Sequence, residues 1–219
     1  FFFEQKITPE EILDDILELT TIRLPKFGPF DPIEDIQVLT PMKRGLLGVD
    51  YLNEKLQSAL NPPHSAKREW KFRAMVFREG DKVMQIKNNY DKEVFNGDLG
   101  RILSIDIEGR VLVSFPGPSG DQEVVYQGQE LEELTLAYAL SIHKSQGSEF
   151  PVVVIPISTQ HYVMLQRNLI YTAITRAKKL LVLVGTKQAL NIAIRTNRAM
   201  KRYSLLSSRI QDEYAQARF

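Results

Sequence analysis

Two cations lie on a glycine-flanked loop directly after a short apolar run. The run Ile36–Leu39 has the composition of a buried strand, and Thr40-Pro41-Met42-Lys43-Arg44-Gly45 follows it. Open α/β sheets bind ligands at the carboxyl ends of their strands, and Lys and Arg there suit an anion such as phosphate. A solvated surface loop is the alternative interpretation, and the loop's composition alone leaves it open.

A second polar segment, His143–Glu149, reads HKSQGSE. Its Lys, Ser and Gln side chains and the backbone amides near Gly147 can hold a nucleic-acid backbone or a nucleotide. Glu149 can accept hydrogen bonds from a ribose hydroxyl. The alternative is a polar turn between strands. His143 has no second His nearby and no H-E-x-x-H pattern, so the sequence predicts no metal site.

The third segment is Tyr171–Lys179, whose periodicity predicts a helix. A helix would place Thr172, Thr175 and Arg176 within one turn of each other. The arginine side chain is always charged and binds phosphate oxygens in bidentate fashion. A surface arginine on an amphipathic helix is the alternative.

The phosphate cradle of an ATPase is missing from the sequence. No G-x-x-x-x-G-K-[ST] pattern occurs, and Asp212-Glu213 lies in a polar C-terminal segment rather than after a buried strand. Neither the P-loop nor a Mg²⁺-binding acidic pair is therefore present. We expect that this chain by itself is not a complete ATPase.

Composition limits the class of protein. The 219 residues are 43% hydrophobic and 25% charged, and they contain no cysteine. These values disfavour wholesale disorder and exclude disulfides and thiolate metal sites. The apolar runs are too short to cross a membrane, and the lack of cysteine is compatible with the cytoplasm, where we expect the protein to act. The net charge of +1 argues against a uniformly basic nucleic-acid binder.

Alternating helix and strand patterns predict an α/β domain with parallel strands. Because Phe1 is not Met and the chain opens in mid-pattern, we expect a fragment of a longer protein. From about Asp81 to Leu134 the pattern changes to short strands and tight turns, which favours a small barrel. The predicted elements are a helix beginning at Thr8-Pro9, strand 36–39, helix 49–60, hairpin 101–107/111–115, strand 136–142, strand 152–157, helix 169–178, strand 180–184 and helix 187–195.

Taken together, three segments resemble motifs IV, V and VI of superfamily 1 helicases. They are Ile36–Gly45 (IQVLTPMKRG), Ala137–Phe150 (AYALSIHKSQGSEF) and Leu169–Lys179 (LIYTAITRAKK). The residues in these motifs are most similar to those of the RecD-like branch, which includes stand-alone bacterial helicases and the alpha subunit of exodeoxyribonuclease V. Gly80–Met84 and Val94–Gly100 also resemble that branch.

The resemblance implies the second RecA-like motor domain of such a helicase, with a parallel sheet of P-loop-NTPase type but no P-loop of its own. Residues 1–100 and 132–219 would form this domain, and 101–131 an inserted SH3-like β-barrel. ATP and Mg²⁺ would be bound mainly by a missing N-terminal motor domain.

The resemblance also implies roles for particular residues. Arg176 matches the motif VI arginine that reaches the γ-phosphate, Arg44 the motif IV cation on the same phosphate, and Glu149, with Gly147, the motif V positions near the nucleotide. The positions expected to contact single-stranded DNA, or to couple it to ATP, are Thr40, Pro41, Asn96, His143, Lys144, Ser145 and Gln146.

The implied function is the C-terminal part of an ATP-dependent DNA helicase that moves 5′ to 3′ on single-stranded DNA and unwinds duplex. Its expected partners are single-stranded DNA, the N-terminal motor domain and other recombination or repair subunits, with no membrane. The alternative is a nucleic-acid-binding module, or a docking subunit of a nuclease complex, without motor activity.

Overall fold

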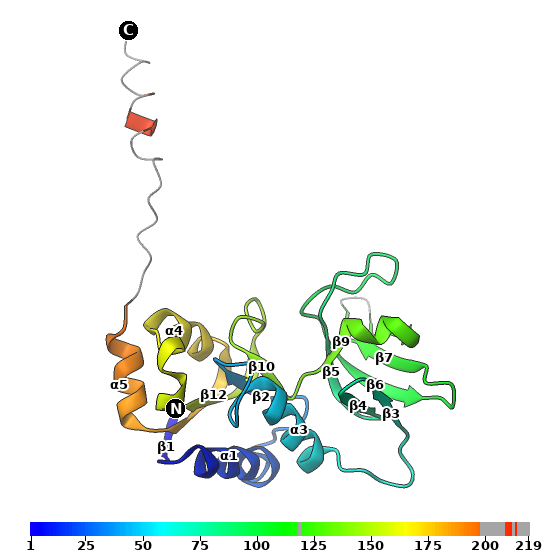
Figure 1. Cartoon of the computed structure of the whole chain (residues 1–219), viewed down its shortest axis with the longest axis horizontal. Helices are drawn as coiled ribbons and strands as arrows, with labels where there is room; N and C mark the ends of the chain where they lie inside the picture. Colours follow the sequence, from blue (N-terminus) through cyan, green and yellow to red (C-terminus); the bar gives the residue numbers. More distant parts are fainter. Residues whose placement is uncertain (118–119, 198–208, 212, 214–219) are drawn as a thin grey trace.

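The computed structural model describes residues 1–117, 120–197, 209–211 and 213, and it folds into two lobes (Figure 1). Asp212 lies outside the described residues. The first lobe is built on a five-stranded sheet in the order β1-β12-β11-β2-β10, and every pairing in it is parallel. Its strands are β1 (Phe2–Gln5), β2 (Ile36–Thr40), β10 (Ala139–Ser141), β11 (Phe150–Ile157) and β12 (Ala177–Gly185). The predicted parallel α/β fold is confirmed.

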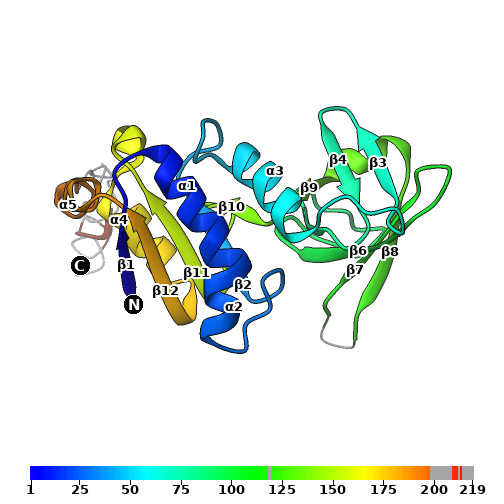
Figure 2. The ribbon, with the colours of Figure 1, turned by 90° about the horizontal axis from the view of Figure 1, so that it is seen from below.

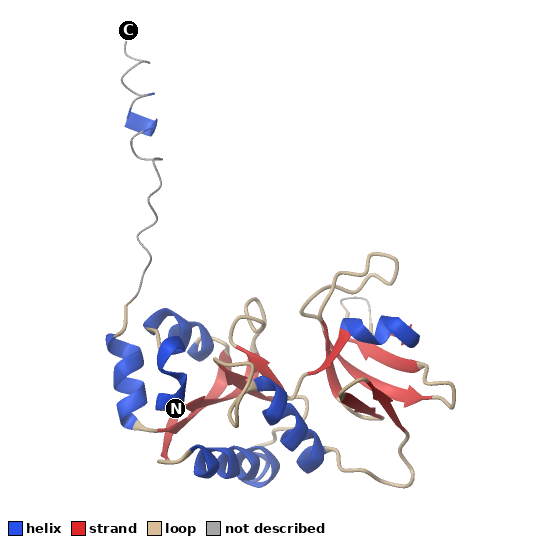
Figure 3. Cartoon of the chain, in the orientation of Figure 1, coloured by secondary structure: helices blue, strands red, loops and turns tan. Residues whose placement is uncertain are grey.

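Helices cover both faces of this sheet, as Figures 2 and 3 show. The first begins at a capping box in which Thr8 and Glu11 satisfy each other's backbone amides. α1 (Pro9–Glu18) and α3 (Val49–Leu60) pack on one face, and α4 (Arg167–Ile174) and α5 (Lys187–Arg195) lie on the other. A short π-helical turn (Leu19–Arg23), α2 (Leu24–Phe27) and 3₁₀ segments at Gly128–Glu133 and Thr159–Met164 complete the helical elements up to residue 197 in the part of the chain that the structure describes.

The second lobe is an antiparallel sheet in the order β8-β7-β6-β5-β9, joined by a separate hairpin, β3–β4. Its strands are β3 (Glu69–Phe72), β4 (Met75–Arg78), β5 (Lys82–Gln85), β6 (Leu99–Ile105), β7 (Val111–Phe115), β8 (Gln122–Tyr126) and β9 (Leu134–Leu136). No pairing joins β8 to β9 among the described residues, so the expected closed barrel is not seen. The sheet also extends beyond the expected boundaries 101–131, because β5 and β9 pair with each other outside that range.

Two predicted elements differ from the structure near the segments of interest. The strand predicted at 136–142 is two strands, because Ala137 and Tyr138 cross between the lobes: β9 belongs to the second sheet and β10 to the first. The helix predicted at 169–178 ends at Ile174, because the chain from Ala177 joins the parallel sheet as β12. Arg176 therefore lies after the helix rather than within it.

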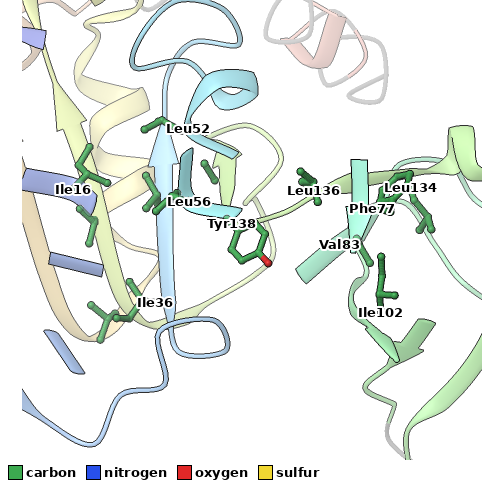
Figure 4. Packing of buried hydrophobic residues seen from close by; sticks show 14 of the residues in the cluster. Ile16, Ile36, Leu52, Leu56, Phe77, Val83, Ile102, Leu134, Leu136 and Tyr138 are labelled. Carbon is green, nitrogen blue, oxygen red and sulfur yellow. The ribbon is translucent and has the colours of Figure 1, made fainter. Parts of the chain in front are cut away.

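A continuous cluster of buried apolar side chains joins the two lobes. Figure 4 shows Tyr138 between Leu56 on the first lobe and Val83 on the second. The hydroxyl of Tyr138 donates to Asp81 Oδ1 at 2.9 Å, and Asp81 is 0% exposed. Burial raises the pKa of Asp81, and its hydrogen bonds to Asn61, Tyr138 and Gln57 oppose that rise. The joint between the lobes is therefore packed and hydrogen-bonded rather than a loose linker.

In the part of the chain that the structure describes, no helix combines the length and the apolar character that crossing a membrane requires.

Candidate functional site

The first and second candidate segments leave the sheet at the same edge. Ser141 at the end of β10 is paired in register with Thr40 at the end of β2, and the Ile142 amide donates to the Thr40 carbonyl at 3.1 Å. The Thr40 hydroxyl is buried and donates to the Leu47 carbonyl at 2.6 Å, which fixes the loop between them. Pro41 is also buried. Thr40 and Pro41 thus shape this edge from beneath instead of presenting side chains to a ligand.

The segment after β10 mixes structural and exposed residues. Ser145 is buried, and its hydroxyl donates to the Ile142 carbonyl at 2.9 Å. Gly147 has φ of +89°, a left-handed conformation that favours glycine at this turn. His143, Lys144 and Gln146 are exposed. These three side chains are the ones available to a ligand.

The structure brings Lys144 together with Asn96, a residue of the second lobe. Lys144 Nζ donates to Asn96 Oδ1 at 2.7 Å. The two positions are far apart in the sequence and were both expected to contact DNA. Asn96 is exposed on the turn that Gly97 completes with φ of +107°. The contact places this turn beside the candidate segment of the first lobe.

A groove of about 540 Å³ lies between the lobes next to this contact. Its lining includes the apolar residues Phe72, Met84 and Leu140. Four cationic residues line it: Lys43, Arg73, Lys87 and Lys144. Arg73 is paired with Glu132, whereas Lys43, Lys87 and Lys144 have no carboxylate partner among the described residues. Asp50 and Glu132 are the acidic residues of the lining, so the groove carries a surplus of positive charge.

Arg44 does not meet Arg176. Arg44 is exposed and lines a neighbouring hollow of about 800 Å³ together with α3 and the β3–β4 hairpin. Arg44 follows the carboxyl end of β2, whereas Arg176 precedes the amino end of β12. In a parallel sheet these ends are opposite edges. The geometry therefore gives no support for the expectation that both cations reach one phosphate.

Arg176 is half-buried and is held by oxygen acceptors. Its guanidinium donates to the Thr172 carbonyl at 3.2 Å, the Ser148 carbonyl at 3.1 Å and the Thr175 hydroxyl at 3.2 Å. Within the described residues no carboxylate lies at ion-pair distance from it. Its charge is thus fixed in position but not neutralised, which suits binding of an anion from outside the chain.

Glu149 lies close to this arginine in the fold. The backbone of Phe150 pairs with the residues that follow Arg176, and the Phe150 amide donates to the Arg176 carbonyl at 2.8 Å. Glu149 is exposed and forms an ion pair with Lys178 at 3.2 Å. Arg176, Glu149 and Ser148 therefore form a second group, at the amino edge of the sheet.

Two buried basic side chains lie outside the groove and outside the group around Arg176. Burial lowers the pKa of Lys82 to about 8, and its amine donates to the Ile33 carbonyl at 2.7 Å. Burial lowers the pKa of His161 to about 4, and its Nδ1 has no hydrogen-bond partner among the described residues. The described residues hold no group of three or more His, Asp or Glu side chains placed to bind a metal ion.

Sequence reasoning missed several residues that shape the groove. Lys43 lies in the first candidate segment, but Arg44 was the residue to which a role was assigned, and Lys87 follows shortly after β5. The sequence around Phe72 shows no strand signal. The fold collects these residues from three distant stretches, so spacing along the chain could not have revealed them together. The strand-end rule does not extend to Lys87, because β5 lies in an antiparallel sheet.

Two known domain families match the chain. The ATP-dependent RecD-like DNA helicase SH3 domain matches residues 52–115, and the UvrD-like helicase C-terminal domain matches residues 136–184. The ATP-dependent RecD2 DNA helicase of Deinococcus radiodurans is 42% identical over 171 residues, which are 78% of this chain and 23% of the relative. The RecBCD enzyme subunit RecD of Haemophilus influenzae is 31% identical over 177 residues, 81% of this chain and 25% of the relative. The chain thus spans about a quarter of the length of these curated relatives.

Solved structures of Pif1 helicases share the fold. The Bacteroides Pif1 helicase in complex with ADP-AlF3 and single-stranded DNA aligns with a TM-score of 0.52 and 15% identity, covering 96% of this chain and 51% of that one. The Candida albicans Pif1 helicase aligns with a TM-score of 0.50 and 20% identity, covering 96% and 60%. At these identities the likeness concerns the fold.

Proposed function

We propose, from the premise that this chain matches the C-terminal part of RecD-like helicases, that it is the second motor domain of an ATP-dependent DNA helicase acting in the cytoplasm. In this proposal the groove between the lobes holds single-stranded DNA. Arg176 contacts the γ-phosphate of ATP that is bound by an N-terminal motor domain. Movement from 5′ to 3′ is part of the proposal and is taken from the family resemblance. The coarser statement, a helicase C-terminal domain, is the one that the relatives support.

The groove has the composition that suits a single strand. Lys43, Lys87 and Lys144 offer cations in its lining, together with apolar side chains. Cations bind the phosphates without regard to sequence, and such binding weakens steeply as salt rises. The apolar part of the lining accommodates bases or sugars that a duplex would keep inside. Lys144 contacts Asn96 here, so both lobes would touch the same strand.

Arg176 is suited to act on a phosphate supplied by another domain. ATP supplies the phosphoanhydride whose hydrolysis drives movement, and negative charge grows on the γ-phosphate as that bond breaks. A guanidinium delivered from a second domain stabilises this charge only when the cleft between domains closes. Arg176 has its charge uncompensated by carboxylates in the described chain, and three hydrogen bonds hold it in place.

One observation carries the proposal: a single segment reaches from the groove to Arg176. It starts after Ser141 at the carboxyl edge of the sheet, presents Lys144 to the groove, and ends where the Ser148 carbonyl accepts from Arg176 at 3.1 Å. Movement of this segment on DNA binding would move the arginine, and the reverse also holds. Such reciprocity is what coupling between two sites requires.

The test of the groove measures binding of labelled oligo(dT) to this chain at several salt concentrations. Lys43→Ala and Lys144→Ala should each weaken binding and lower the slope of log K against log salt by about 0.7, the value for one phosphate on a single strand. Lys187→Ala is the matched control, because Lys187 is exposed on α5, away from the groove. An unchanged slope in both groove variants would contradict the assignment of the groove.

The second candidate function is a nucleic-acid-binding or docking subunit of a nuclease complex without motor activity. The groove is compatible with it, because strand binding does not require Arg176. The two candidates separate on ATP: a full-length protein with DNA-stimulated ATPase activity supports the motor, and one that binds DNA without turnover supports the subunit.

A further inference from the structure

Two large aromatic side chains stand exposed on the loop between β5 and β6. Tyr90 is 75% exposed and Phe95 is 45% exposed. Their ring centroids lie 6.0 Å apart with an interplanar angle of 74°, so one ring meets the other edge-on. Figure 1 shows this loop rising above the second lobe. None of the roles assigned above uses either ring.

The exposure does not come from a loosely held loop. Asn89 and Val94 exchange backbone hydrogen bonds of 2.8 and 3.1 Å across it. The Asn96 amide donates to Asn88 Oδ1 at 2.9 Å, and Asn89 Nδ2 donates to Glu133 Oε2 at 3.1 Å. Val94 is buried beneath the loop, whereas the adjacent Phe95 points its ring to solvent. The loop backbone that carries both rings is therefore held in place before any ligand arrives.

The loop adjoins the groove at both of its ends. Lys87 at its start lines the groove. Asn96 near its end accepts from Lys144, which lines the groove from the first lobe. Phe95 directly precedes Asn96 in the chain, so its backbone lies next to this contact.

The charged residues around the loop favour binding of a nucleic acid on one of its two sides. The far side borders a hollow of about 450 Å³ that Tyr90 lines together with Asp91, Glu93 and Glu123. Lys92 also lines that hollow and is paired with Glu130. Phosphates would be repelled there and attracted on the side of Lys144. Tyr90 lines this acidic hollow and Phe95 does not, so Phe95 is the ring that we assign to a strand in the groove.

We propose that Phe95, supported edge-on by Tyr90, is a stacking site for one nucleobase of the strand in the groove. This inference rests on the proposed function, because it needs the strand to lie along Lys43, Lys87 and Lys144. The site takes any base, since every base presents a π face, and it adds a contact that phosphate binding does not provide. Bases rather than phosphates are its ligand class.

The test compares two probes with this 219-residue chain. One is labelled oligo(dT) of about 12 nucleotides, within the range that one small binding module covers. The other is an abasic oligomer of the same length and charge. Phe95→Ala should weaken oligo(dT) binding about 5- to 100-fold and leave binding of the abasic oligomer unchanged. Phe95→Trp should restore binding, whereas Phe95→Leu should not, because leucine is apolar but cannot stack. Tyr162→Ala is the matched control, an exposed aromatic residue of the first lobe.

The outcomes separate the inference from the function on which it rests. If Lys43→Ala weakens binding of both probes while Phe95→Ala changes neither, the groove stands and the stacking site is refuted, which would leave the aromatic pair as a protein contact. If Phe95→Leu binds oligo(dT) like the wild type, the contact is merely apolar and the inference fails. If the wild-type chain binds neither probe at low salt, the groove itself fails, and the stacking site fails with it.

Discussion

Replacing Tyr138 by Phe should measurably destabilise the whole chain. Asp81 accepts four hydrogen bonds: from Tyr138 at 2.9 Å, Gln57 at 2.6 Å, Asn61 at 2.8 Å and the Arg78 amide at 2.7 Å. The substitution removes one donor from a fully buried carboxyl and leaves the packing of the ring nearly unchanged. A hydrogen bond to a charged group contributes about 1.5–3 kcal/mol, and we expect a loss of about 2 kcal/mol.

The donor role of Tyr138 agrees with the raised pKa of its hydroxyl. Burial and the negative charge of Asp81 raise the pKa of Tyr138, so its hydroxyl keeps its proton at neutral pH. Asp81→Ala should cost more than Tyr138→Phe, because it removes a buried acceptor shared by four donors. The amides of Gln57 and Asn61 would keep only their bonds to the Val76 and Glu79 carbonyls.

The assay is urea unfolding followed by the fluorescence of Trp70, the single tryptophan of the chain, which lies on β3 in the second lobe. With an m value of about 2 kcal/mol per molar urea, the midpoint should fall by about 1 M. Tyr162→Phe is the control, since Tyr162 is exposed. A Tyr138→Phe midpoint that coincides with that of the control would show that the Tyr138–Asp81 bond does not hold the lobes together.

Two further predictions concern the arginine and the buried histidine. In the full-length protein, Arg176→Ala should lower ATP turnover about 10³-fold or more while nucleotide affinity changes little, because in the proposed function the arginine stabilises charge that grows during bond cleavage. Turnover like that of the wild type would refute this proposed role. His161 has a folded-state pKa of about 4, below its unfolded value, so the unfolded chain binds the extra proton and stability falls with falling pH below about 6.5. The loss attributable to His161 between about pH 7.5 and pH 5 should be about 2 kcal/mol, and His161→Phe should remove this component from urea unfolding measured across that range; parallel pH profiles of the two proteins would contradict the assignment.

Local signals predicted much of the first lobe because its elements carry their own boundaries. The capping residues Thr8 and Glu11 located α1, and a helix-period pattern ending at Asn61-Pro62 located α3, which spans Val49–Leu60 as predicted. The continuous Val and Ile run of β11 indicated a strand buried on both faces. Where such local signals are strong, the helix or strand in the folded structure lies where they predict it.

The sequence-based predictions fail where contacts between distant parts of the chain, and not the local sequence, determine the structure. β1 and the β3–β4 hairpin are short and partly exposed, so they show little apolar periodicity. Nothing local distinguishes Ala137-Tyr138 from the strands on either side, although this pair crosses between two sheets. The strand-end rule located the loops of Lys144 and Arg44, but only the register of the sheet shows that Arg176 belongs to the opposite edge.

The shared core across Tyr138 has a mechanical consequence. Because the apolar cluster runs without a break from one lobe to the other, the lobes should unfold in one cooperative transition and turn as one stiff body. A displacement at Arg176 would then reach the far wall of the groove without being absorbed at a hinge. In the proposed motor, bending would therefore occur at the connection to the neighbouring domain and not between these two lobes.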